Sequence, residues 1–103
     1  MEPGQFNLST SGAVVDLISA GKDVRNLNHI RVTNNLTIDT TVILRLQPAD
    51  GSYTGATLLN AVLPGRVTVE LTDGLRYNSE VLILQAQATP SSGATTNISI
   101  ILT

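Results

Sequence analysis

Apolar and polar residues alternate along much of this chain with a period of two, which is typical of β-strands that are buried on one side. The two clearest runs are residues 39–47 and 94–102, where Ile43 and Ile101 are the apolar exceptions on the polar side. The side expected to face a core carries Val42, Leu44, Leu46, Ile98, Ile100 and Leu102. Both runs are bounded by clusters of Gly, Pro, Asn, Asp or Ser, which favour turns.

Residues 66–88 look like the centre of the fold. Three aliphatic residues alternate over 67–71, a turn follows at 72–74, and a short linking strand leads into a second long strand at 80–88. Residues 81–84 are apolar without a break, as expected for a strand covered on both faces. We expect this stretch to form the core hairpin of the molecule.

The remaining elements are also short strands. Residues 13–18 form a short strand, residues 27–33 alternate, and residues 53–63 form a loop followed by a strand centred on residues 57–59. A helix over residues 13–20 fits the spacing of three aliphatic side chains, but the segment is short and rich in β-branched residues, so we prefer a strand.

About eight short strands separated by turns, without a convincing helix, predict an all-β fold. We expect an antiparallel β-sandwich, either immunoglobulin-like or jelly-roll-like, whose two sheets share one layer of inward side chains. A length of 103 residues fits a single domain, residues 1–103.

The beginning of the chain permits two interpretations. Phe6 and Leu8 alternate with polar neighbours before a turn cluster at residues 9–12, as in an edge strand. Residues 1–8 could equally be an extended N-terminal arm that becomes ordered only against a neighbouring subunit.

Charged residues are scarce, at 14% of the chain against about 25% in soluble domains. Thr, Ser, Asn and Gln take their place, and these side chains can be buried at a protein contact at modest desolvation cost if they find hydrogen-bond partners. This favours a packing role. The alternative is that exposed strand faces carry such residues in any case.

The charge balance disfavours several classes of function. A net charge of −2 with six scattered cationic residues does not suit nucleic acid, and three aromatic residues give no stacking platform. The chain has no cysteine, no apolar stretch that could cross a membrane, and no recognisable signal peptide. We therefore expect synthesis in the cytoplasm and no membrane partner.

Residues suited to catalysis or metal binding are sparse. His29 is the only histidine and lies among alternating residues, so we expect it on the solvated face of a strand. Asp50 and Asp73 each precede a glycine and are explained by turn geometry. We expect no catalytic, cofactor-binding or metal-binding residue and no enzymatic activity, with a loop site of turn carboxylates as the remaining metal alternative.

Packing against other proteins is the function that remains. Four apolar residues stand on faces that are otherwise polar, and exposed apolar patches usually mark contacts. The candidate contact residues, with the N-terminal aromatic side chain included, are Phe6, Ile43, Val81, Ile83 and Ile101. We expect a homo-oligomer, either a dimer or a trimer. The alternative is that these side chains are covered within one copy of the chain.

The order of strands and turns over roughly residues 30–102 resembles small virion proteins of tailed bacteriophages. The segments that carry the resemblance are Asp50-Gly51-Ser52-Tyr53, Leu58-Leu59-Asn60, Val62-Leu63-Pro64, Val67-Thr68-Val69, Leu71-Thr72-Asp73-Gly74-Leu75, Val81-Leu82 and Gln85-Ala86-Gln87-Ala88. They are patterns of strands and turns and include no catalytic signature.

The resemblance implies a capsid decoration (cement) protein in the virion, in contact with the major capsid protein or other virion subunits. A head–tail, neck or tail accessory protein is the nearest alternative. A host-surface or carbohydrate-binding sandwich is another, although a chain with 3% aromatic residues has few rings to stack on sugars.

Overall fold

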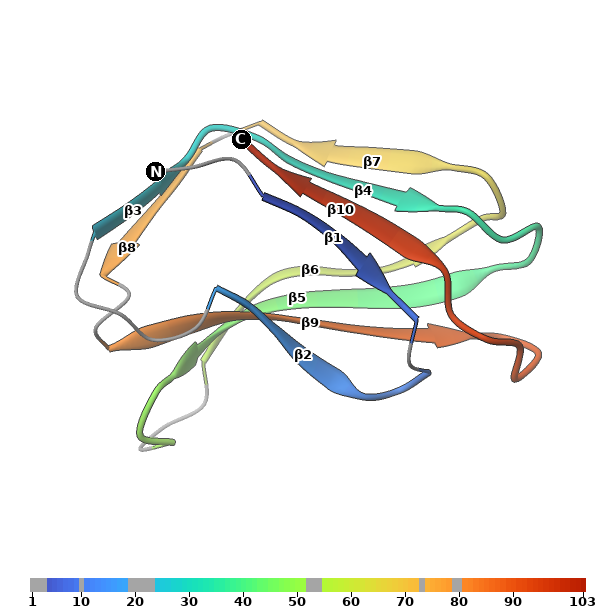
Figure 1. Cartoon of the computed structure of the whole chain (residues 1–103), viewed down its shortest axis with the longest axis horizontal. Coiled ribbons are helices and arrows are strands. Elements are labelled where there is room, and N and C mark those ends of the chain that lie inside the picture. The colour runs from blue at the N-terminus through green and yellow to red at the C-terminus, as the bar shows by residue number, and fades with distance from the viewer. Residues whose placement is uncertain (1–3, 10, 19–23, 52–54, 73, 79–80) are drawn as a thin grey trace.

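The computed structural model describes residues 4–9, 11–18, 24–51, 55–72, 74–78 and 81–103. Within these ranges every regular element is a strand (Figure 1). The strands, in chain order, are β1 (Gly4–Leu8), β2 (Val14–Ile18), β3 (Val24–Leu27), β4 (Ile30–Asn34), β5 (Thr40–Pro48), β6 (Ala56–Leu63), β7 (Thr68–Leu71), β8 (Leu75–Asn78), β9 (Leu82–Pro90) and β10 (Ile98–Leu102).

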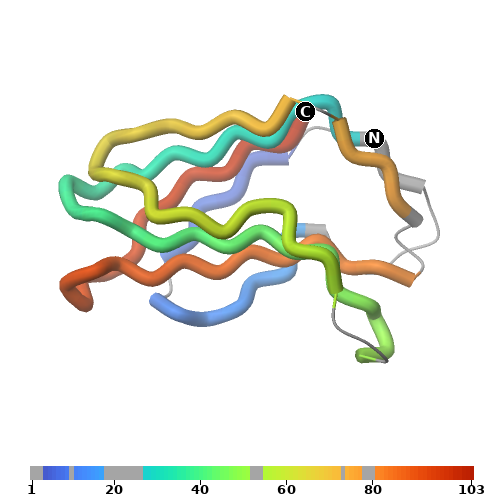
Figure 2. The backbone as a smooth tube through the Cα atoms, turned by 180° about the vertical axis from the view of Figure 1, so that it is seen from behind, coloured from blue at the N-terminus to red at the C-terminus, as the bar shows by residue number. Residues whose placement is uncertain are grey.

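Eight of the strands form two antiparallel sheets that lie one above the other (Figures 1 and 2). Sheet A has the order β1-β10-β4-β7, and sheet B has the order β2-β9-β5-β6. A third pair, β3 and β8, forms a small ribbon at one end of the sandwich. Two four-stranded sheets with this order have the topology of a jelly roll. The predicted β-sandwich is confirmed.

The core fills the space between the two sheets. Along β5 the residues are alternately buried and half-buried, so every second side chain points toward sheet A. Val32 and Ile100 from sheet A and Leu44 and Leu84 from sheet B are fully shielded from solvent. Burial of each such aliphatic side chain stabilises the fold by about 1.5–3 kcal/mol. The inward sets predicted for β5 and β10 are confirmed.

The prediction of a core hairpin at residues 66–88 is wrong. β9 is central, between β2 and β5, as its two-sided apolar character indicated. β7, however, is an edge strand of sheet A and pairs with β4. The linking strand β8 pairs with β3, not with either neighbour in the sequence. The chain therefore crosses from sheet A to sheet B between β7 and β9, with β8 in the ribbon between them.

The single strand expected at residues 27–33 is divided in two. Leu27 pairs with Leu75 in the ribbon, whereas Ile30 pairs with Leu71 and Leu102 in sheet A. Between them the chain turns a corner that is held by hydrogen bonds to the backbone of Thr103. Alternation continues through this corner, which is why the pattern gave no sign of it.

At the start of the chain the structure agrees with the first of the two interpretations, an edge strand, and not with the second, an extended arm. Gly4–Leu8 is the edge strand β1, paired with β10 along its whole length, and is not an extended arm. Residues 13–18, where a helix was the alternative, contain β2. Together with the divided strand, these assignments give ten strands within the described ranges, where about eight were expected.

One end of the sandwich is organised by a buried asparagine. Asn34, at the end of β4, is fully shielded, and its Nδ2 donates hydrogen bonds to the carbonyl oxygens of Ile38 at 2.8 Å and Leu63 at 3.0 Å. Its Oδ1 accepts a hydrogen bond from the backbone N–H of Leu36 at 3.1 Å. One side chain therefore ties the β4–β5 loop to the end of β6.

Candidate protein-contact surface

Each sheet has an outer face, and these two faces are the largest surfaces on which functional side chains could act. The outer B face is defined here by Val14, Asp16, Thr41, Ile43, Arg45, Gln47, Thr57, Asn60, Val62, Ile83, Gln85, Gln87 and Thr89. The outer A face is defined by Gln5, Asn7, Arg31, Thr33, Thr68, Glu70, Ser99 and Ile101.

The outer B face is nearly uncharged and combines aliphatic with amide and hydroxyl side chains. Its two charged residues are Asp16 on β2 and Arg45 on β5. Val14 and Val62, on the two edge strands, are 52% and 59% exposed, which is unusual for large aliphatic side chains of the chain. The scarcity of charged side chains is a property that this face shares with the centre of protein interfaces.

The outer B face is also flat. Between β2 and β5 the surface is hollowed by a cavity volume of only about 10 Å³, lined in part by Val14, Ile43 and Gln87. The Gln85 amide donates to Asp16 Oδ1 at 2.9 Å and the Gln87 amide donates to the carbonyl of Gly12 at 2.8 Å. These bonds hold the side chains of β9 down on the sheet, so the face is prepared for contact with another flat surface.

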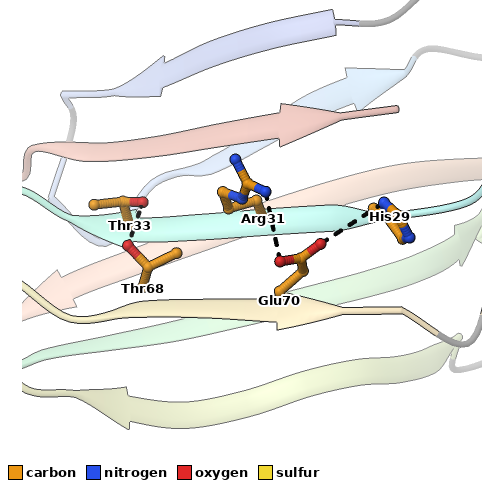
Figure 3. A network of polar contacts seen from close by, with 5 residues as sticks. All are labelled: His29, Arg31, Thr33, Thr68 and Glu70. Carbon is orange, nitrogen blue, oxygen red and sulfur yellow. Dashed lines mark hydrogen bonds and ion pairs between the residues drawn. The ribbon is translucent and has the colours of Figure 1, made fainter.

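The outer A face carries a small charged network (Figure 3). Glu70 on β7 forms an ion pair with Arg31, with Oε2 3.5 Å from Arg31 Nη2, and its Oε1 lies 3.7 Å from His29 Nδ1. Thr33 and Thr68 share a hydrogen bond of 2.9 Å one pair further along the same two strands. His29 is exposed, as expected. A shallow hollow of about 170 Å³ lies over this network, next to Ile101.

The network should contribute little to stability, since its side chains are 35–52% exposed and exposed ion pairs are typically worth about 0–1 kcal/mol. We expect Glu70→Gln to change the free energy of unfolding, measured by urea titration, by less than about 1 kcal/mol. Thr68→Ala is the matched control on the same strand. A larger loss for the glutamine variant would show that these charges stabilise the sheet.

The structure does not bring the five predicted contact residues together. Ile43 and Ile83 lie on the outer B face, whereas Ile101 lies on the outer A face. Phe6 faces inward and packs against the core, and Val81, 54% exposed, lies in the turn before β9. The expectation of one shared apolar patch is therefore wrong, because β10 belongs to the opposite sheet from β5 and β9.

The signal that sequence reasoning missed is the pair of exposed valines. Val14 lies in a segment for which a helix was the alternative, and Val62 lies in a strand whose centre was placed at residues 57–59, so neither was a candidate. Their identity as outward residues follows from pairing, since Val14 is opposite Gln87 and Val62 is opposite Thr41.

A pocket of about 160 Å³ opens at the end of the sandwich where the β3–β8 ribbon meets the sheets. The residues lining it are Leu27, Asn28, Ile30, Leu58, Leu71, Gly74 and Leu75. This lining is aliphatic and contains no aromatic ring on which a sugar could stack. It does not favour a carbohydrate site.

Clusters of metal-ligating side chains and membrane-spanning helices are the remaining kinds of functional feature. No group of three or more His, Asp or Glu side chains gathers within the part of the chain that the structure describes. The same residues contain no helix long and apolar enough to cross a membrane. The turn at Asp73, one of the carboxylates considered for a loop metal site, lies outside the described residues.

Comparison with known proteins adds a fold relationship. No protein-family model and no curated protein matches the chain. A solved structure described as the crystal structure of PirA is similar over 97% of this chain and 91% of its own, with a TM-score of 0.58 and 10% sequence identity. At this identity the similarity shows a shared all-β architecture and carries no functional assignment.

Proposed function

We propose that the chain is a structural protein of a tailed-phage virion, most specifically a capsid decoration protein that packs on the head lattice and stabilises it by protein–protein contact. It would be made in the host cytoplasm and would contact the major capsid protein or other virion subunits. A position at the neck or tail would use the same surface. We propose no enzymatic role.

The observation that carries this proposal is the outer B face. It is flat, has one acidic and one basic residue, and exposes Val14 and Val62 by more than half. A surface of this kind loses little hydration energy when a second protein covers it. The virion assignment is supported by the resemblance of residues 30–102 to small phage virion proteins, and the jelly-roll topology is also used by viral capsid domains.

The proposal is tested on purified particles of a phage that encodes the chain. Mass spectrometry is expected to find the protein in the particles, and particles made without the gene are expected to release DNA at lower temperature. Purified protein added back should bind and restore heat resistance. Absence of the protein from the particles would refute the proposal.

Two matched variants test the surface. Ile43→Asp places a charge on the outer B face and Ile101→Asp places the same charge on the outer A face, and both isoleucines are half-buried in their strands. We expect Ile43→Asp to reduce the amount of added protein retained on particles by at least about tenfold, a loss of about 1.4 kcal/mol. Ile101→Asp should bind as the wild type does. Equal binding by both variants would exclude the outer B face.

A further inference from the structure

Two matched pairs of residues flank β9 on the outer B face. Gln87 pairs with Val14 on β2 and with Ile43 on β5, so it has an aliphatic residue on either side. The next outward residue, Gln85, pairs with Asp16 on β2 and with Arg45 on β5, so it has an acid on one side and a base on the other.

We infer that a second copy of this chain covers the outer B face, related by a two-fold axis that lies in the interface and runs along β9. Such an axis exchanges the strands on either side of β9. Ile43 of each copy then faces Val14 of the second copy, and Arg45 faces Asp16 of the second copy. Gln85 and Gln87 lie on the axis, and each amide is held by a hydrogen bond within its own copy, to Asp16 Oδ1 at 2.9 Å and to the carbonyl of Gly12 at 2.8 Å.

The charges make this arrangement specific. Asp16 and Arg45 are on strands about 10 Å apart, two strand spacings, and neither has an ion-pair partner among the described residues. On the outer A face, by contrast, Arg31 already contacts Glu70 within the same copy. On the outer B face Asp16 Oδ1 accepts a hydrogen bond from the neutral Gln85 amide, which does not compensate its charge, so Asp16 and Arg45 can each still meet an opposite charge of a partner.

The expected dimer is weak. β2, β9 and β5 together present a plane of roughly 14 by 30 Å to the second copy. This is about 400 Å² from each copy, or about 800 Å² in total, which is below the roughly 1,200 Å² of stable specific interfaces. We therefore expect weak association with rapid exchange.

Charge reversal tests the inference. The variants are Asp16→Arg, Arg45→Asp and the double variant, with Arg31→Asp as a matched reversal on the outer A face. Sedimentation and light scattering should show a concentration-dependent wild-type dimer and at least about tenfold weaker self-association in each single variant. The double variant and Arg31→Asp should associate as the wild type does.

Mixing the two single variants is the decisive measurement. Asp16→Arg carries Arg at both positions and Arg45→Asp carries Asp at both, so the mixture should form a heterodimer although neither variant pairs with itself. A wild type that remains monomeric at its highest soluble concentration would overturn the inference. So would a mixture that associates no better than its components.

A crosslink tests the axis without altering either charge, and so serves if a charge variant fails to fold. The chain has no cysteine, so Gln87→Cys introduces a unique thiol on the axis. Facing sheets lie about 10 Å apart, beyond the reach of a disulfide, and a short bis-maleimide should therefore join two copies. Ser99→Cys, on the outer A face, is the control. Equal crosslinking of the two variants would contradict the arrangement.

This inference deepens the proposed function and rests on it in one respect, the assignment of the outer B face as a subunit contact. The second copy occupies the face through which the chain would bind the capsid, so the dimer must separate before that contact forms. The two fail separately. A monomeric protein that binds particles through Ile43 would overturn the pairing and leave the virion role. A protein that dimerises with the expected charge-swap behaviour but is absent from particles would overturn the virion role and leave the pairing.

Discussion

Leu44→Ala is expected to lower the free energy of unfolding by about 2–5 kcal/mol, as for other fully buried leucines replaced by alanine. Leu44 is fully shielded, lies in β5 between β6 and β9, and faces sheet A. Its loss leaves a cavity that two packed sheets cannot close easily, because the strands on either side fix its position.

The matched control is the neighbouring residue. Ile43→Ala removes a side chain of similar size from the same strand but from the outer B face, where the group is half-exposed. We expect Ile43→Ala to lower the free energy of unfolding by well under half of the loss caused by Leu44→Ala. Urea titration and thermal unfolding of the two variants provide the comparison. Equal losses would mean that the outer face is covered within one copy of the chain.

Asn34→Asp is expected to give the second largest loss in the free energy of unfolding. The substitution keeps the shape of the side chain and replaces its NH2 group with an oxygen. The amide that donates to Ile38 and Leu63 becomes a carboxylate oxygen pointing at the same two carbonyl oxygens. Each buried group left without a partner costs about 1–3 kcal/mol. The site is fully shielded, so water does not replace the lost bonds.

Asn35→Asp is the control for this change. The amide of Asn35 donates to the Ser99 hydroxyl at 2.8 Å, and a hydroxyl can turn to donate to a carboxylate instead. We expect its stability at neutral pH, measured by thermal unfolding, to stay near that of the wild type while the Asn34 variant melts many degrees lower. Similar melting temperatures for both variants would show that the Asn34 hydrogen bonds contribute little.

Local pattern was sufficient for the strands that keep one face buried from end to end. Alternation located β5 and β10, and it separated Leu44 from Ile43 and Ile100 from Ile101 correctly. It did so because a strand's side chains alternate by geometry, whatever the strand's neighbours are.

The pairing between strands could not be predicted from the local pattern of apolar and polar residues. Nothing local distinguishes a hairpin from a crossover, so β7 and β9 were joined although they lie in opposite sheets. The same lack of information merged Ile101 with Ile43 in one patch. The burial of Asn34 was equally invisible in the local pattern, because it depends on hydrogen bonding to the distant end of β6.

The position of β10 in sheet A has a consequence for how the chain reaches its native state. β10 lies between β1 and β4, and β9 lies between β2 and β5, so each sheet has a late segment as an interior strand. Neither sheet can close before residues 82–102 have left the ribosome. Until then the earlier strands expose their apolar sides, and strands exposed in this way are prone to aggregate. Yield of folded protein should therefore depend on the speed of synthesis and on chaperones that hold unfinished chains.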